Sequence, residues 1–205
     1  MQKRESRRES VSGHKRDLIL DAAREIFAAE GLEGASLRAI ATRAGYTPAA
    51  LYFHFDSKEA IYAEVLRRTL ASLGNAVDAA VVRTRSPRQK FHSAAMAFFR
   101  YYAENPRDLD LGFYLFRGGM KPAGLGHDRD KELNAALEAA LHPIAEAAEA
   151  LGLSRQKANM LMVGCFAHAT GLLLLHTGRI RMFGASAPDL MDAYVRDRIS
   201  QIAKE

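Results

Sequence analysis

The sequence predicts an all-α protein in which three N-terminal helices precede a larger helical domain, with about nine helices in total. Apolar residues recur at helical spacing along almost the whole chain, and no stretch alternates convincingly between apolar and polar residues. Glycine and proline residues divide this pattern at places that suit helix ends. With 205 residues, 48% of them hydrophobic, the chain can also bury a substantial core.

The N-terminal segment 1–14 is basic and shows no apolar periodicity. Two interpretations stay open: a solvated, flexible tail, or an arm that adds phosphate contacts to a polyanion that is already bound. From Asp17 onward the apolar residues form one helical stripe, which predicts a first helix of about four turns. Gly31 is expected to end this helix in the left-handed conformation, with Leu32 folding back on Phe27.

Two short helices separated by a tight turn are predicted next. Ser36 can cap the second helix of the chain, and Gly45 closes it abruptly. Thr47 is then a new N-cap, and Pro48 suits the first helical position, where a missing N–H costs nothing. The buried side of this third helix is expected to hold two residues four apart, Leu51 and Phe55.

Longer helices are predicted for the rest of the chain. Asp56 and Ser57 cap a helix from Lys58 to about residue 83. Its inward residues are expected to be Ile61, Val65 and Leu66. Breakers then separate helices near residues 87–104, 109–116, 128–151, 154–179 and 188–203, with loops at 118–126 and 183–188.

Composition and motifs exclude several classes of protein. The single cysteine, Cys165, rules out a disulfide framework, and the seven histidines are scattered without ligand spacing, so we expect no metal and no cofactor. The charged N-terminus does not resemble a secretory signal, which favours the cytoplasm. We find no paired carboxylates, HExxH, GxSxG or phosphate loop, and therefore expect no enzyme. The net charge of +5 agrees with a polyanionic partner.

The second and third helices have the outline of a helix-turn-helix over residues 38–57, approximately. Helix starts at Ser36, Thr47 and Lys58 offer free backbone N–H groups, which bind phosphate oxygens well. Once the core is assigned, the residues left facing outward or at helix starts are Arg38, Arg43, Tyr46, Thr47, Ala49, Tyr52 and Lys58. Tyr52 can donate its hydroxyl to a phosphate while its ring stays packed. This surface is suited to contact with DNA.

Residues 15–66 resemble the DNA-binding domain of the TetR (tetracycline-repressor) family of bacterial transcription regulators. The resemblance rests on residues at fixed spacing: Ser36, Leu37, Ile40-Ala41, Ala44-Gly45, Leu51-Tyr52, His54-Phe55 and Ser57-Lys58. It implies a homodimer with a DNA-binding domain at 15–75 and a helical ligand-binding and dimerisation domain at 76–205. It also implies release from a palindromic operator when a small molecule binds.

The resemblance places backbone contacts on Ser36, Tyr52, His54 and Lys58, and groove-reading positions on Arg38 and on Tyr46, Thr47, Pro48 and Ala49. This chain departs from the usual pattern at Tyr46, where the family most often has a small aliphatic residue, and at Pro48 and Ala49. Base readout should therefore depend on Arg38, Tyr46, Thr47 and a methyl contact from Ala49 to thymine. His54 has two open interpretations, a phosphate contact or a structural residue bonded to backbone.

An aromatic-rich segment after residue 90 is the candidate ligand site. Most of its aromatic residues are expected to be packed core, yet large rigid walls with a few polar groups also suit a pocket for an apolar or amphipathic molecule. The candidate ligand-binding residues are Met96, Phe99, Arg100, Phe113, Tyr114, Arg117 and His168. For His168 and Cys165, buried structural roles are the alternative.

The apolar segment 159–175 approaches the length of a membrane span. Because polar residues interrupt it and no comparable segment exists, we expect a helix buried on several sides and no membrane partner. Together with the last helix it is expected to form a four-helix dimer interface across a twofold axis. The candidate interface residues are Gly164, Ala167, Gly171, Leu175, Met191, Val195 and Ile199.

These observations favour a ligand-responsive DNA-binding repressor that acts on a palindromic operator as a homodimer. Two alternatives stay open: a helical small-molecule-binding protein with little specific DNA binding, and an activator. A helical enzyme or peripheral membrane protein is a more distant alternative.

Overall fold

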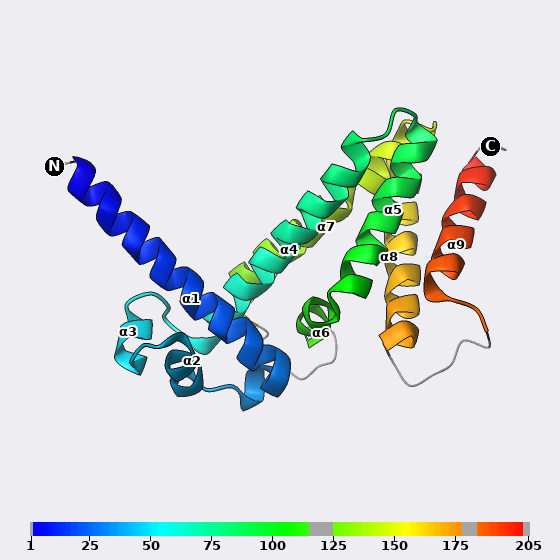
Figure 1. Cartoon of the computed structure of the whole chain (residues 1–205). Coiled ribbons are helices and arrows are strands. Elements are labelled where there is room, and N and C mark those ends of the chain that lie inside the picture. The colour runs from blue at the N-terminus through cyan, green and yellow to red at the C-terminus, as the bar shows by residue number, and fades with distance from the viewer. Residues whose placement is uncertain (1, 115–124, 178–183, 203–205) are drawn as a thin grey trace. The chain divides into compact units, whose positions relative to one another are not determined.

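The computed structural model describes the backbone of residues 2–114, 125–177 and 184–202. Within these ranges, side chains are described except those of residues 2–12, 113, 114 and 177. The described residues form helices and no strand, which confirms the all-α prediction (Figure 1). The helices are α1 (Gln2–Gly34), α2 (Leu37–Ala44), α3 (Pro48–Tyr52), α4 (Lys58–Val82), α5 (Pro87–Glu104), α6 (Pro106–Tyr114), α7 (His127–Glu149), α8 (Arg155–Thr177) and α9 (Ala187–Ile202).

The chain divides into two compact units. The first contains Met1–Thr69 and Arg107–Leu133, and the second contains Leu70–Pro106 and Asn134–Glu205. The division falls inside α4, close to the domain boundary expected after residue 75. The described residues 107–114 and 125–133 group with the N-terminal helices, although the sequence placed them in the second domain.

Helix α1 begins at Gln2, so the backbone of residues 2–14 is helical, which the missing apolar periodicity did not predict. Gln, Lys, Arg and Glu fill much of this segment, and all four are good helix formers. The regular helix is interrupted at Gly31, whose φ of 69° and ψ of 177° are accessible almost only to glycine. Leu32 and Phe27 are both buried, on either side of this break, and their expected contact stays a prediction.

The core of the first unit forms around Phe27 of α1 and Tyr62 of α4, whose rings meet edge to face at 4.9 Å. Tyr62 is 1% exposed, and its hydroxyl donates a 2.6 Å hydrogen bond to the carbonyl oxygen of Leu111 in α6. Helix α6 is also tied to α1, because Nε of Arg24 donates to the buried carboxylate of Asp108 at 2.9 Å. One buried aromatic pair and two polar bonds thus join three helices.

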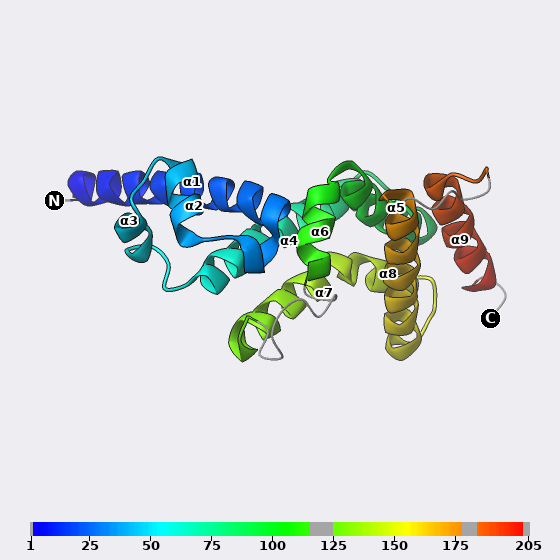
Figure 2. The same ribbon diagram turned by 90° about the horizontal axis from the view of Figure 1, so that it is seen from below.

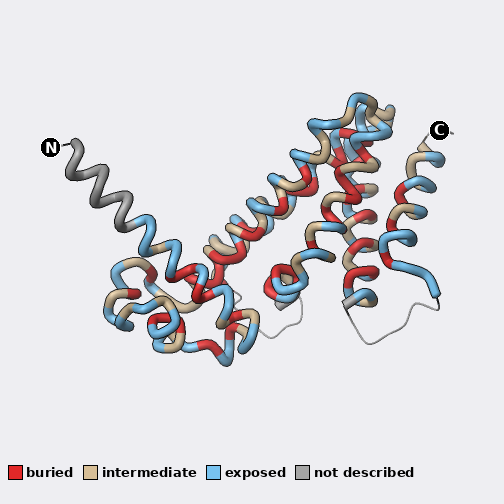
Figure 3. Tube along the Cα trace, viewed as in Figure 1, coloured by how far each residue is buried: buried red, intermediate tan, exposed pale blue. Residues whose placement is uncertain are grey.

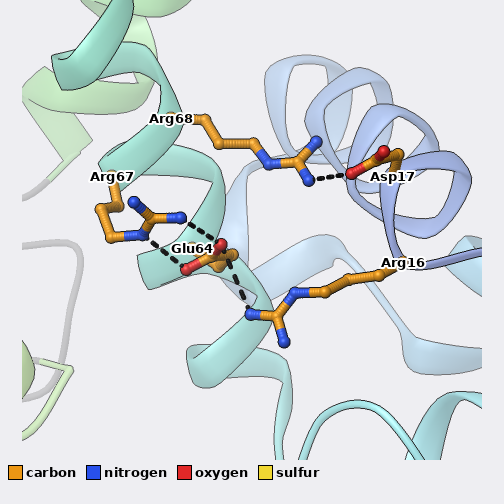
Figure 4. A network of polar contacts seen from close by, with 5 residues as sticks. All are labelled: Arg16, Asp17, Glu64, Arg67 and Arg68. Atoms are coloured by element: carbon orange, nitrogen blue, oxygen red, sulfur yellow. Dashed lines mark hydrogen bonds and ion pairs between the residues drawn. The ribbon is translucent and has the colours of Figure 1, made fainter. Parts of the chain in front are cut away.

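A network of charged side chains closes the outer edge of the α1–α4 contact (Figure 4). Arg16 and Arg67 approach Glu64 with N–O distances of 3.4 and 2.6 Å, and Arg68 binds Asp17. The guanidinium of Arg16 also lies 4.8 Å from the centre of the Phe55 ring. The hydrogen bonds from Arg67 lower the pKa of Glu64 below its ordinary value, despite the opposing effect of burial.

In the second unit, α5, α8 and α9 pack against one another (Figures 1 and 2). Helix α5 starts at Ser86, which forms a reciprocal capping box with Gln89. Its buried residues include Phe91, Phe98 and Phe99, the large side chains of this core.

Helix α8 differs from the expectation that it is buried on several sides. Among the described residues it is the one helix long and apolar enough to cross a membrane, but only 33% of its apolar window is buried. Buried and exposed positions alternate along it at helical spacing (Figure 3). One face therefore packs inside the unit, while the other presents apolar side chains on the surface.

The pKa of Glu64 leads to a pH-dependent prediction. Glu64→Gln should lower the free energy of unfolding at pH 7 by about 1 kcal/mol, because the Gln side chain loses the charge-assisted bonds to Arg67 and Arg16. A lowered carboxyl pKa stabilises the fold fully above the ordinary pKa, and this stabilisation is lost as pH falls toward the lowered value. Urea unfolding from pH 7 down to pH values near the lowered pKa should therefore show the two proteins converging. A constant difference at every pH would contradict this.

Candidate nucleic-acid interface

Helix α2 is closed at both ends by the residues that the sequence indicated. At its start, Oγ of Ser36 accepts a 3.1 Å hydrogen bond from the N–H of Ala39. At its end, Gly45 adopts the left-handed conformation with a φ of 76°. The N–H of Tyr46 donates to the carbonyl of Ala41 at 2.8 Å, and that of Gly45 donates to Thr42 at 3.1 Å. These two bonds define a Schellman motif, which turns the chain sharply after α2.

Helix α3 follows directly from this turn. Oγ1 of Thr47 accepts from the N–H of Ala50 at 3.3 Å, and Pro48 occupies the first turn. Leu51 and Phe55 are 1% and 6% exposed, so the predicted buried side is confirmed. These two anchors fix the rotation of α3 about its axis, and its remaining residues face outward.

Most of the predicted groove-reading residues lie on the surface. Arg38, Thr47, Pro48 and Ala49 are exposed, and Tyr52 is 59% exposed. Tyr46 and His54 are half-buried beside them, with the Tyr46 backbone used in the turn. The surface combines a guanidinium, hydroxyls and methyl groups, the types of group that read base edges and hold phosphates.

Three of the predicted DNA-binding residues have partners within the chain. Arg43 donates to the carboxylate of Glu25 in α1 at 2.7 Å. Nζ of Lys58 donates to the carbonyl oxygens of Ala35 at 3.0 Å and Glu33 at 3.5 Å, which ties the start of α4 to the end of α1. Ser36 caps α2. In this structure these side chains position the interface, and their contacts with DNA stay predictions.

Sequence reasoning missed Phe53 as a member of this surface. It is 88% exposed and directly follows Tyr52, the last residue of α3. The signal was present, because Phe53 and Phe55 cannot both face the core and the four-residue spacing from Leu51 selects Phe55. An exposed phenyl ring at this place is suited to contact with a thymine methyl group or a sugar.

Comparison with known proteins identifies the family. Residues 19–65 match the family model described as "Bacterial regulatory proteins, tetR family". The uncharacterized HTH-type transcriptional regulator TtgW of Pseudomonas putida is 31% identical over 114 residues, which cover 56% of this chain and 81% of TtgW. The chain belongs to the TetR family.

One further relative and one solved structure show how far the sequence similarity and the fold extend. The HTH-type transcriptional activator FasR of Mycolicibacterium smegmatis is 35% identical over 99 residues. These residues span 48% of this chain and 45% of FasR, so the match covers less than half of either protein. The transcriptional regulator FadR of Bacillus subtilis, solved in complex with stearoyl-CoA, shares the fold, with a TM-score of 0.68. That likeness covers 89% of this chain and 97% of the FadR chain at 16% identity.

Of the candidate ligand residues whose side chains are described, two line one groove in this TetR-family chain. Phe99 is completely buried, whereas Met96 and Arg100 line a groove of about 290 Å³ along α5. His168 stacks on Tyr194 of α9 at 3.9 Å, and burial lowers its pKa. The side chains of Phe113 and Tyr114, and all of Arg117, lie outside the described residues.

The burial of Cys165 is consistent with the structural alternative for that residue. It is 1% exposed, and burial raises the pKa of its thiol to about 12. Neither side chain, His168 or Cys165, lines the groove along α5.

The candidate dimer residues need correction. Met191 and Val195 are fully buried within their own chain, so they cannot meet a second copy, and Gly164 lies against the Tyr194 hydroxyl of the same chain. Ile199 lines a cavity within the chain, and Leu175 is half-buried. Ala167 and Gly171 remain on the surface. They belong to an exposed apolar stripe of α8 that the sequence reasoning did not identify in full: Met160, Val163, Ala167, Gly171 and Leu174.

The Schellman turn leads to a stability prediction. Gly45→Ala should lower the free energy of unfolding by about 1–2 kcal/mol, because a left-handed φ strains any side chain although no atom lies within 4 Å of the added methyl group. The matched control is Gly112→Ala in α6, where space is also free and no positive φ is required, so alanine should be neutral or stabilising. Urea denaturation measures both, and equal effects would contradict the role of the turn.

Proposed function

We propose that the protein is a transcriptional regulator in the cytoplasm that binds a palindromic DNA operator as a homodimer and is released by a small apolar or amphipathic molecule. The observation that carries this proposal is the exposed face of α3, set by the Schellman turn at Gly45 and the buried anchors Leu51 and Phe55. A short helix presented in this way fits the major groove, where Arg38 and Thr47 can reach base edges.

The exposed stripe of α8 supports the dimer. Met160 is 69% exposed and Val163 is 56% exposed, and Ala167 and Gly171 between the larger residues permit a close approach of a second helix. A contiguous apolar face on a regulator is an expected interaction surface. A twofold pair of chains would present two recognition helices to two half-sites of a palindrome.

Release by a small molecule is supported by the helical second unit. The groove along α5, lined by Met96, Ala97 and Tyr101 among others, is the described site suited to an amphipathic molecule. FadR, which has the same fold, binds stearoyl-CoA in its solved structure, and this chain is proposed to respond to a ligand in the same general way.

Repression is the direction we propose. A dimer seated on DNA excludes other proteins from the same site without any further contact, whereas activation needs an additional surface for the transcription machinery. FasR is an activator, so whether DNA binding by this protein represses or activates transcription is a separate question for experiment.

Footprinting tests the proposed function directly. The purified full-length protein should protect a short palindrome upstream of its own or a neighbouring gene, and protection should weaken steeply as salt rises. Protection no stronger than on random DNA would favour the alternative of a helical ligand-binding protein with little specific DNA binding.

Arg38 should contribute both affinity and specificity. Arg38→Ala should weaken binding to the palindrome by about 1–3 kcal/mol and reduce the preference over random DNA, because a base contact is lost. The control is Arg85→Ala, an exposed arginine of the second unit with the same charge change. Fluorescence anisotropy with both DNAs measures the two effects, and an equal loss on palindrome and random DNA would show that Arg38 contacts phosphate only.

The dimer face gives a further prediction. Val163→Arg should convert the dimer to monomers in sedimentation velocity, because it buries a charge in an apolar interface. Val82→Arg is the matched control, since Val82 is 83% exposed and lies outside the α8 stripe. If both variants stay dimeric, the interface is elsewhere.

A further inference from the structure

A cationic cavity lies in the second unit, where the end of α4, the start of α5 and α9 meet. It has a volume of about 500 Å³. Arg83 and Arg88 line it together with His92, Ser93 and Arg196. None of these residues belongs to the DNA-binding surface.

Positive charge is concentrated in one segment that contributes to this cavity. Between residues 79 and 103 the chain carries five basic residues and no acidic one, which equals the net charge of +5 for the entire protein. The five are Arg83, Arg85, Arg88, Lys90 and Arg100. Helix α5 accordingly has no acidic residue in its first turn, although its N-terminus would favour one.

Asp192, an acidic residue beside the cavity, already has two hydrogen-bond partners. Asp192 receives a 2.6 Å hydrogen bond from Nε of Arg196, and its other oxygen lies 2.6 Å from Nε2 of His92. Both bonds lower the pKa of Asp192, with that to Arg196 the larger effect. In the described part of the chain, Arg83 and Arg88 pair with no carboxylate, so two guanidinium charges at the cavity are free to bind an anion.

A groove with a mixed polar and apolar lining continues from this cavity. The two share His92 and Ser93, and the groove extends along α5 to Tyr101, a distance of roughly 14 Å from His92 at the helical rise per residue. Its apolar walls are Ala76 and Ala80 of α4 with Met96 and Ala97 of α5, and Arg100, Tyr101 and Glu104 also line it. A cationic cavity that opens into a partly apolar groove matches a molecule with an anionic end and an apolar body.

We propose that the cavity and groove together bind an amphiphile whose phosphate-bearing end lies between Arg83 and Arg88 and whose apolar part follows α5 toward Tyr101. Two guanidinium groups present several donors in a fork geometry that suits a phosphate dianion better than a single carboxylate. This inference rests on the proposed ligand-responsive function and names the chemical class of the ligand.

Calorimetric titration of the full-length protein with dodecyl phosphate, below its micelle concentration, tests the proposal. Dodecanoate serves as the ligand of equal chain length with a single carboxylate. Dodecyl phosphate should bind the unmodified protein at least about tenfold more tightly than dodecanoate, and Arg83→Gln/Arg88→Gln should abolish that difference. The matched control is Arg85→Gln/Lys90→Gln, which removes two exposed charges from the same segment but none from the cavity lining. It should keep the preference within about twofold.

The outcomes are separable. Three results would each overturn the proposal. The first is an equal preference for dodecyl phosphate in all three proteins, and the second is an equal loss of that preference in both variants. The third is no saturable binding of dodecyl phosphate to the unmodified protein. Affinity for the palindrome is measured in parallel, and both variants should keep it. Loss of DNA affinity in Arg83→Gln/Arg88→Gln alone would show that the pair contacts DNA instead. If the unmodified protein fails to bind DNA but binds dodecyl phosphate, the proposed function fails while the assignment of this site stands.

Discussion

The packing of Phe27 against Tyr62 is the contact on which the first unit depends. It holds α1 on α4, and Tyr62 extends the contact to α6 through its hydroxyl. Helices α2 and α3 are too short to be stable alone. They are held by burying Ile40 and Leu51, with α2 packed on α1 and α3 packed on α2. The exposed face of α3 is therefore determined by residues that never reach the surface.

Charged residues near the interface divide into two groups with different roles. Arg43 and Lys58 are bound within the chain, to Glu25 and to backbone carbonyls at the end of α1. Arg38 is exposed and available. Neighbouring basic residues thus either hold the helices together or face DNA. A substitution at Lys58 affects the packing of α4 on α1 as well as any phosphate contact. Substitutions at Arg38 are the cleaner probe of recognition.

The sequence predicted local features well and relations between helices poorly. The caps at Ser36 and Thr47, the turn at Gly45 and the burial of Leu51 and Phe55 follow from local chemistry, and all are confirmed. The dimer residues Met191 and Val195 were misassigned, because periodicity shows that a face is apolar but not which partner covers it. The cationic cavity was missed for a similar reason, since Arg196 is far from Arg83 in sequence.

Hydrogen–deuterium exchange of the full-length protein on its footprinted palindrome tests the central claim most directly, because it reports which surface meets DNA. The account predicts added protection over residues 36–54, in α2, the turn and α3, compared with random DNA of the same length. It predicts no added protection at the start of α5, where the second concentration of positive charge lies. Protection centred on residues 83–93, with residues 36–54 unchanged, would contradict the account.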